Sequence, residues 1–236
     1  MSAALDGPRI PAAAGKTSQL VVFLHGYGAD GNDLIELGRQ WRALMPEAAF
    51  VSPHAPERTP GAPMGRQWFA LSNRSPDDTA GGGERWTGAV KARSAIDAFL
   101  DAELQRLGLD DSKLALVGFS QGTMLALHVG LRRSRPPAAI LGYSGQLVGP
   151  EHLAEARPPG AKPSPILLVH GSDDDVIPLE SLFDSAEALA QAKIPSQWHL
   201  SIGLGHGIDG AGLMHGGLFL AQCFKLKLKL SPAPGG

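Results

Sequence analysis

Residues Leu114–Leu127 have the sequence LALVGFSQGTMLAL. The first part, LALVGF, is a short apolar run of the length expected for a buried β-strand. The last part continues as TMLALHVGL, which is too uniformly apolar for a surface helix and predicts a helix packed on both sides. Between them lies the G-x-S-x-G pentapeptide of residues 118–122, with Ser120 at its centre. The stretch therefore predicts a strand, a sharp turn and a helix, with a serine on the turn.

This arrangement is typical of a nucleophile elbow. A serine on such a turn is exposed above the sheet edge, at the positive end of the following helix. The flanking glycines are needed because side chains there would collide with the neighbouring strand and helix. The pentapeptide alone is a weak signal, since the chain has 30 glycines and a glycine-rich turn could hold an ordinary serine. The strand before Ser120 and the helix after it favour the elbow.

Length and composition point to one α/β domain. A chain of 236 residues can bury a substantial core, so we expect a single domain over residues 1–236, with an N-terminal arm (1–17) and a C-terminal tail (226–236). The net charge is −2 and no basic block is present, which argues against a nucleic-acid or anionic-membrane partner. The single cysteine, Cys223, excludes an internal disulfide.

The start of the chain and its apolar runs bear on where the protein is expected. The start, MSAALDGPRIPAAAGK, has no charged segment followed by an apolar one, so we do not expect a secretory signal. No apolar run approaches the ~20 residues of a membrane span, so we expect no membrane insertion. Together these features predict a cytoplasmic protein.

Apolar runs and helical spacing alternate along the chain. The predicted strands cover residues 20–24, 48–52, 114–119, 138–143, 166–169 and 196–202. The predicted helices, besides the one after Ser120, cover residues 32–41, 87–107, 179–192 and 212–225. We expect a long loop over residues 57–85 and a surface excursion over 150–165, and the KLKLKL run at 225–230 is left unassigned. Strands that alternate with helices imply an α/β fold with a mostly parallel sheet covered on both faces.

A serine needs a base to take its proton and an acid to orient that base. On parallel sheets that carry such an elbow, these follow the serine in the order acid, then histidine, each after a strand. The strand at 166–169 is followed by Asp173, Asp174 and Asp175, and the spacing does not choose among them. The last strand is followed by His206 between two glycines. His206 is therefore the predicted base.

Four other histidines are less suitable. His128 and His215 fall in predicted helices, His199 falls within a strand and His152 lies in a proline-rich loop, so we interpret these four as packing or surface residues. No helical His pair or Cys cluster indicates a metal site, and we predict none.

An oxyanion hole requires two backbone N–H groups. One is predicted at Gln121, the residue after the serine, and the other in the glycine-rich turn HGYG at residues 25–28. That turn has neither the G-x-G-x-x-G spacing of a dinucleotide site nor the Gly-Lys-Ser/Thr of a phosphate loop. An ordinary strand-to-helix turn would also use glycines, so this alternative stays open.

Six segments in order resemble the phospholipase/carboxylesterase family of α/β-hydrolases, which includes the acyl-protein thioesterases. They are HGYGADG (25–31), SPHAPERTP (52–60), QWF (67–69), GFSQG (118–122), HGSDDDVIP (170–178) and GLGHG (203–207). The resemblance extends from Leu20 to the last helix. It implies an α/β-hydrolase fold with little or no cap, acting on acyl esters or thioesters without a cofactor.

The resemblance also implies roles for single residues. Ser120 matches the nucleophile and His206 the base, and Asp174 matches the acid because it precedes the Val-Ile-Pro stretch at 176–178. The family has proline where this chain has Asp175. Thr123 stands where many members have glycine or alanine.

For substrate contacts the resemblance implies Tyr27 as the second oxyanion donor, through its backbone N–H, where the family more often has leucine. Trp68 matches a tryptophan beside the acyl pocket, and Leu71 and Val176 are predicted pocket neighbours. Trp68 and Phe69 could equally be core residues under the long loop.

We therefore expect a serine hydrolase (a carboxylesterase) that cleaves a small-molecule acyl ester through a Ser120–His206–Asp174 triad and an acyl-enzyme. The substrate could be a short carboxylic ester, a lysophospholipid or a thioester. A non-catalytic binding protein that keeps the α/β-hydrolase scaffold is the alternative. A homodimer that covers part of the site rim stays open.

Overall fold

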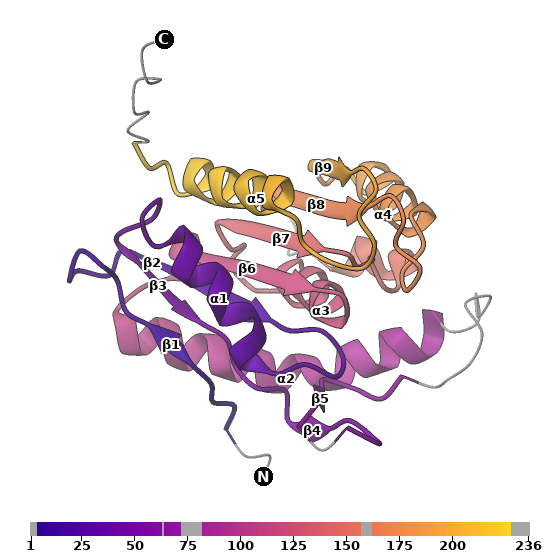
Figure 1. Cartoon of the computed structure of the whole chain (residues 1–236), viewed down its shortest axis with the longest axis horizontal. Coiled ribbons are helices and arrows are strands. Elements are labelled where there is room, and N and C mark those ends of the chain that lie inside the picture. Colours follow the sequence, from indigo (N-terminus) through magenta and orange to yellow (C-terminus); the bar gives the residue numbers. More distant parts are fainter. Residues whose placement is uncertain (1–3, 63, 72–81, 157–161, 228–236) are drawn as a thin grey trace.

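The structure is a computed structural model that describes residues 4–62, 64–71, 82–156 and 162–227. Seven strands form one sheet (Figure 1). In their order across the sheet they are β1 (Arg9–Ile10), β3 (Ala48–Val51), β2 (Gln19–Leu24), β6 (Leu114–Phe119), β7 (Ala139–Tyr143), β8 (Ile166–Gly171) and β9 (Ser196–Ser201). β1 runs antiparallel to β3, and every other neighbouring pair is parallel. All carboxyl ends of the parallel strands therefore meet at one edge.

Helices cover both faces of this sheet, as the alternation of elements predicts (Figure 1). On one face lie α1 (Gly31–Trp41) and α5 (Gly210–Cys223), which share a buried core cluster. On the other face lie α2 (Gly82–Leu107), α3 (Gln121–Gly130) and α4 (Glu180–Gln191), which share a second cluster. The α/β-hydrolase fold expected from the sequence is confirmed.

The stretch that predicted the fold lies at the centre of the sheet. β6 pairs with β2 on one side and β7 on the other, and its first five residues are buried. Every residue of α3 is buried as well, because α2 packs over it from outside. The uniform hydrophobicity of this helix is thus explained by packing on two sides.

Several boundaries differ from those predicted. Part of the N-terminal arm pairs with the sheet as β1, and Arg9 forms an ion pair with Glu103 of α2 at 2.8 Å. Within the predicted loop 57–85, β4 (Glu57–Arg58) and β5 (Arg66–Gln67) form a small antiparallel ladder, and α2 begins at Gly82. Two-residue strands are too short to show alternation, so the sequence pattern could not reveal them.

Towards the C-terminus the predicted elements shift by a few residues. β8 continues through His170 to Gly171, and a 3-10 turn, η2 (Pro150–Glu155), opens the proline-rich excursion. α5 ends at Cys223, so the start of the KLKLKL run at 225–227 is not helical, and residues 228–236 lie outside the described part. Cys223 is half-buried against the core, and burial raises the pKa of its thiol to about 11.

Among the described residues, no helix combines the length and hydropathy needed to cross a membrane. The same residues contain no group of three or more His, Cys, Asp or Glu side chains arranged to hold a metal ion.

Candidate active site

Ser120 lies on the turn between β6 and α3 with φ 53° and ψ −116°, a backbone conformation that residues other than glycine rarely adopt. Its N–H donates to the Tyr143 carbonyl at the end of β7, at 2.9 Å. The predicted elbow geometry is therefore present. The N-terminus of α3 begins directly after it, so the positive end of the helix dipole faces the serine.

Close packing explains the two glycines of the pentapeptide. A Cβ added to Gly122 would lie 1.7 Å from the Leu24 carbonyl oxygen, and one added to Gly118 would lie 2.3 Å from the Gly122 carbonyl oxygen. Both distances are far inside van der Waals contact. Only glycine fits at either position, as the elbow interpretation expects.

Thr123, the departure from the family pattern, is fully buried behind the elbow. Its Oγ1 donates to the Tyr143 carbonyl at 2.8 Å, the same oxygen that Ser120 N–H binds. Two glycines make room for it, because a Cβ at Gly142 or Gly145 would lie 2.4 Å from a Thr123 side-chain carbon. The larger side chain thus reinforces the turn.

Asp174 contacts His206 across 32 residues of sequence. The distance from His206 Nδ1 to Asp174 Oδ2 is 2.8 Å, and to Oδ1 it is 3.0 Å. The carboxylate is fully buried, whereas the His206 side chain keeps 18% of its exposure. Of the three adjacent aspartates, Asp174 is the buried one, and Asp173 and Asp175 are exposed. An acid and a base are thus paired at the carboxyl edge of the sheet.

The Asp174 carboxylate is held by further donors. The backbone N–H groups of Val176 and Ile177 donate to Oδ1 at 3.0 and 2.9 Å. Burial disfavours the charged form, but the Ile177 N–H, His206 and the Val176 N–H outweigh it and hold the pKa of Asp174 below its usual value. The group is therefore ionised at neutral pH and can accept a proton from His206 Nδ1.

His170, a residue to which the sequence assigned no role, packs on the same carboxylate. It is buried at the end of β8, with its Nε2 3.4 Å from Asp174 Oδ2 and 2.9 Å from the Ile177 carbonyl. Because a carbonyl can only accept, Nε2 carries a hydrogen. His170 therefore braces both the carboxylate and the turn that follows it.

The loop that carries His206 is fixed from two directions. The His206 ring lies against Phe119, the residue before the nucleophile, with ring centroids 4.9 Å apart. Ser144, buried with φ 43° after β7, donates from Oγ to the Gly207 carbonyl at 3.1 Å. Ser144 is a second residue that the sequence did not single out, since a lone serine after a strand carries no pattern.

The glycine-rich turn after β2 lies beside the nucleophile, because a Cβ at Gly26 would be 3.4 Å from Ser120 Cβ. His25, fully buried, accepts from Ala55 N–H through Nε2 at 3.0 Å and contacts the Gly26 carbonyl through Nδ1 at 2.8 Å. Nε2 is thus the unprotonated nitrogen, and Nδ1–H orients the Gly26–Tyr27 peptide. Burial lowers the pKa of His25 to about 4, which keeps the ring neutral.

Trp68 connects the two predicted oxyanion segments. Its indole Nε1 donates to the His25 carbonyl at 2.9 Å, and its backbone N–H donates to the Gln121 side chain at 3.0 Å. The Gln121 amide in turn donates to the Phe69 carbonyl at 2.8 Å. Trp68 and Phe69 belong to the buried core, as the alternative interpretation held. This bridge sets the spacing between the Tyr27 turn and Gln121.

The remaining predicted residues differ in exposure. Tyr27 is 38% exposed and Val176 is 58% exposed, whereas Leu71 packs partly buried against the core. A polar bridge such as that of Gln121 could not have been found from sequence, because it joins segments 52 and 53 residues apart.

Comparisons with known proteins identify the family of this chain. The family model of phospholipase/carboxylesterase matches residues 5–224. An acyl-protein thioesterase 1 of Gibberella zeae is 28% identical over 214 residues (87% of this chain and 91% of that protein), and the esterase YpfH of Escherichia coli is 26% identical over 203 residues (83% and 78%). The crystal structure of esterase PE8 superposes with a TM-score of 0.86 at 41% identity, covering 93% of this chain and 99% of that one. The chain therefore belongs to the phospholipase/carboxylesterase family of α/β-hydrolases and is a carboxylic ester hydrolase.

Proposed function

We propose that the protein is a serine esterase that cleaves carboxylic acyl esters or thioesters through a covalent acyl-enzyme. Ser120 is the nucleophile, His206 the general acid–base and Asp174 the orienting acid. The observation that carries this proposal is the buried Asp174 carboxylate 2.8 Å from His206 Nδ1, with the His206 ring against the residue that precedes the elbow serine.

The first half of the reaction forms the acyl-enzyme. Ser120 Oγ attacks the carbonyl carbon of the substrate while His206 Nε2 takes the hydroxyl proton. Because Asp174 holds Nδ1–H, Nε2 is free to accept, and the nearby carboxylate stabilises the imidazolium that forms. His206 then protonates the departing alcohol or thiol. In the second half water attacks the acyl-enzyme through the same groups in reverse.

The tetrahedral oxygen develops negative charge and needs two donors. We assign these to the backbone N–H groups of Tyr27 and Gln121. The first helical N–H groups have no partner inside their helix, so Gln121 at the start of α3 is suited to this role. His25 and Trp68 support the assignment, since their hydrogen bonds orient the Gly26–Tyr27 peptide and connect it to Gln121.

The substrate is a small molecule with an acyl group. Leu71 and Val176 are assigned to its pocket, with Trp68 as the support behind it. Two relatives bear on the choice of leaving group, one called an acyl-protein thioesterase and one an esterase. Both oxygen and sulfur esters place the same tetrahedral carbon at Ser120, so a thioester is a second candidate for the same machinery.

Labelling with a fluorophosphonate and turnover of p-nitrophenyl acetate test this proposal. The native chain should be labelled at Ser120, and Ser120→Ala and His206→Ala should lose both labelling and turnover by about 10⁴-fold or more, because an unactivated serine is inert. Ser112→Ala and His215→Ala, at exposed positions of the same residue types, should behave as the native protein. A folded native chain that resists the probe would favour the alternative, a non-catalytic ligand-binding protein.

A further inference from the structure

Four residues other than glycine have a positive φ in the described part of the chain, namely Ser120, Ser144, Lys193 and Lys225. The two lysines are exposed and follow the ends of α4 and α5, where a left-handed residue commonly closes a helix. Ser120 and Ser144 are instead buried, and a left-handed backbone costs stability in any residue with a Cβ. Strain that is kept at a buried position points to a function. For Ser120 that function is nucleophilic attack, which leaves Ser144 to be explained.

Ser144 follows β7 directly and lies next to the elbow. Its N–H donates to the Val169 carbonyl at 2.9 Å, so its backbone continues the pairing of β7 with β8. The carbonyl of Tyr143, one residue earlier, accepts from Ser120 N–H at 2.9 Å. Gly145, one residue later, packs on the elbow, because an added Cβ would lie 2.7 Å from the Ser120 carbonyl oxygen. Both neighbours of Ser144 are therefore fixed to the turn that carries the nucleophile.

The loop that carries His206 is held by few contacts. Glycines flank the histidine, and a Cβ added at 205 or 207 would have its nearest neighbour at 3.8 or 3.9 Å. Glycine leaves the backbone free to adopt other conformations. Among the described residues, the hydrogen bonds of segment 205–208 are those between the imidazole and Asp174 and the one from Ser144 Oγ to the Gly207 carbonyl, at 3.1 Å. The Ser144 hydroxyl thus makes the hydrogen bond that connects this loop to the nucleophile side.

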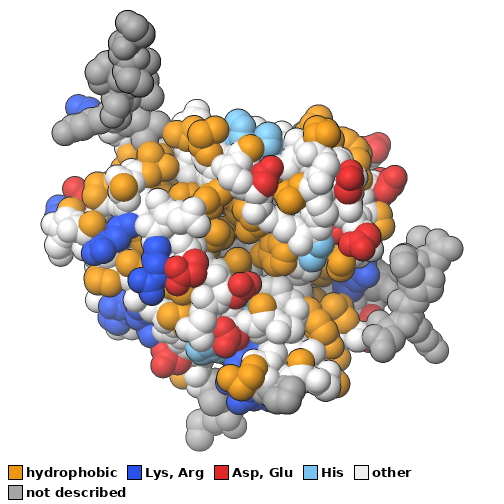
Figure 2. Space-filling model, viewed as in Figure 1, with side chains coloured by type: hydrophobic (Ala, Val, Ile, Leu, Met, Phe, Trp, Pro, Cys, Tyr) orange, Lys and Arg blue, Asp and Glu red, His pale blue; other side chains and the backbone are white. Residues whose placement is uncertain are grey.

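This loop lies at the carboxyl edge of the sheet, on the right in Figure 1. Figure 2 shows hydrophobic, acidic and histidine side chains exposed on that side of the molecule. The His206 side chain itself keeps 18% of its exposure. A glycine-flanked loop at an exposed edge has few buried contacts that restrict it, so each hydrogen bond to its backbone matters more for the position of the imidazole.

We infer that Ser144 is a positioning residue of the reaction proposed above, and the inference rests on that proposal. Its hydroxyl holds the backbone after His206 at a fixed distance from the elbow, so the imidazole stays where it can take the proton of Ser120. Asp174 orients the ring through Nδ1, whereas Ser144 fixes the chain that carries the ring. A glycine at position 144 would adopt the same φ without strain but has no hydroxyl. The bond to Gly207 therefore explains why a strained serine is present.

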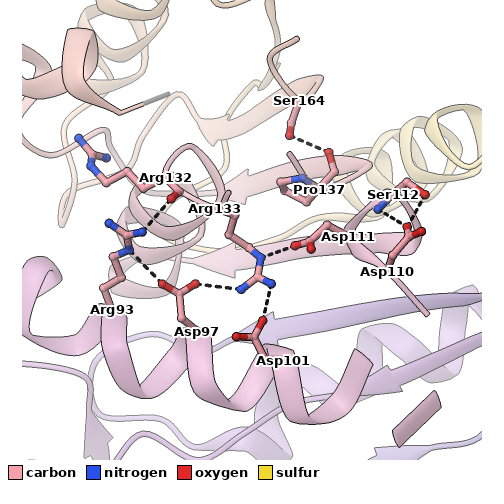
Figure 3. Close-up of polar contacts among 10 residues, drawn as sticks. All are labelled: Arg93, Asp97, Asp101, Asp110, Asp111, Ser112, Arg132, Arg133, Pro137 and Ser164. Carbon is pink, nitrogen blue, oxygen red and sulfur yellow. Dashed lines mark hydrogen bonds and ion pairs between the residues drawn. The ribbon is translucent and has the colours of Figure 1, made fainter. Parts of the chain in front are cut away.

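The alternative is that this bond stabilises the fold and nothing more, and Ser164 provides a matched comparison. Ser164 is also buried, and its Oγ donates to the Pro137 carbonyl at 2.7 Å (Figure 3). The two residues precede β8 and β7, at the opposite edge of the sheet from His206. Ser164→Ala thus removes a buried bond from a serine to a main-chain carbonyl without touching the site.

Turnover of p-nitrophenyl acetate by the native chain, Ser144→Ala, Ser144→Gly and Ser164→Ala tests the inference. Both Ser144 variants should lose at least about tenfold in kcat, because a small misplacement of a catalytic group slows the reaction by one to two orders of magnitude. KM should stay within about twofold, since acylation and deacylation both use His206 and slow together. Ser164→Ala should keep the native kcat within about twofold.

The two Ser144 variants also separate the bond from the strain. Alanine keeps a Cβ in the left-handed conformation, whereas glycine relieves it, so Ser144→Gly should melt at a higher temperature than Ser144→Ala. Thermal melts followed by circular dichroism measure this difference. Equal losses of kcat in two proteins of different stability are expected if the hydroxyl acts on the position of His206.

A loss of kcat below about tenfold in either Ser144 variant would overturn the inference while the proposed function stands. So would a loss that Ser164→Ala shares, or a parallel rise in KM, which would mean that the substrate site itself had changed. Two Ser144 variants that fail to fold would also count against it, because the hydroxyl would then be needed for the fold. A native chain that neither turns over the ester nor reacts with a fluorophosphonate would refute the proposed function and this inference together.

Discussion

At the scale of single residues the chemistry depends on which aspartate meets His206. The chain has three adjacent candidates, and only Asp174 is both buried and 2.8 Å from Nδ1. Its carboxylate also closes a local turn by accepting from Val176 and Ile177. The backbone groups thus hold Oδ1, while His206 Nδ1 lies within hydrogen-bond distance of both oxygens and nearer to Oδ2.

We expect Asp174→Asn to lower kcat for p-nitrophenyl acetate by about 10⁴-fold, because an amide stabilises the wrong imidazole tautomer and no imidazolium. Asp173→Asn and Asp175→Asn change exposed neighbours and should stay within about threefold of the native rate, since surface substitutions seldom matter. Steady-state kinetics of the native protein and the three variants measures these differences in kcat. Equal losses at Asp174 and at a neighbour would mean that the turn, and not the carboxylate, is what the reaction needs.

Much of this residue-level arrangement could be predicted. Ser120 and His206 follow from local signals, a pentapeptide between a strand and a helix and a histidine between glycines after the last strand. The aspartate could not be chosen by spacing, because three identical side chains give one pattern. His170 and Ser144 were missed for a related reason, since each acts on a group that only the folded chain brings near.

At the scale of elements, a charged cluster connects α2 to the segment after α3 (Figure 3). Arg133 is 7% exposed and bonds Asp97 and Asp101 of α2 at 2.9 and 2.6 Å, and its Nε pairs with Asp111. Burial alone would lower its pKa, but the carboxylates of Asp111 and Asp101 raise the pKa of Arg133 above the usual value. The guanidinium thus joins α2, the turn before β6 and the end of α3.

Arg133→Met should reduce the free energy of unfolding by about 2–4 kcal/mol, because the buried carboxylate of Asp111 would be left without its partner. Arg39→Met removes an exposed ion pair, with Glu36 at 2.8 Å, and should cost less than about 1 kcal/mol. Urea unfolding followed by circular dichroism measures both. If the two variants lose the same stability, burial of the Arg133 cluster contributes nothing beyond an ordinary surface pair.

Elements were predictable where the pattern was long. The eleven residues of α1 repeat a helical period and the six of β6 form a continuous apolar run, and both were found within one residue. β4 and β5 have two residues each and no period, and β1 depends on a partner 40 residues away. α2 begins at Gly82, five residues before the predicted Thr87. The prediction missed this first turn, GGERW, because its glycines resemble those of a loop.

At the scale of the whole molecule, stability depends on two neutral histidines in the core. Burial lowers the pKa of His25 to about 4, and burial together with Arg132 and Arg93 lowers the pKa of His128 to about 3. In the unfolded chain both titrate near 6.5. Between about pH 6.5 and 4 the unfolded state therefore binds more protons, and stability must fall as the pH falls.

In that window each of these histidines adds about 1.4 kcal/mol per pH unit to the slope of the free energy of unfolding against pH. The two together add about 2.7 kcal/mol per pH unit. His128→Leu removes one titrating group and should reduce the slope between pH 6 and 4.5 by about 1.4 kcal/mol per unit. Its ring nitrogen Nδ1 is buried without a partner, so leucine leaves no hydrogen bond broken there. The test is to measure the free energy of unfolding of both proteins at half-unit steps of pH. If its slope against pH is the same in the variant, protonation of His128 is not linked to folding.

The order of strands across the sheet, and hence which strand is left at its border, lies beyond what the alternation of elements predicts. Periodicity locates a strand but not its neighbours, although the polar residues of β9, SQWHLS, contrast with the apolar runs of β6 and β7 inside the sheet. The uncharged sequence of α5 resembles that of a buried helix such as α3, and only the fold separates the two.

The half-buried Cys223 has a practical consequence for spectroscopy. With a pKa near 11, its thiolate fraction at pH 7.5 is about 300-fold smaller than that of an exposed thiol with a pKa near 8.5. A cysteine introduced at Ile202, which is 81% exposed, would therefore react with a maleimide dye long before the native thiol does. Single-site fluorescent labelling should be achievable by timing alone, with the natural cysteine left in place.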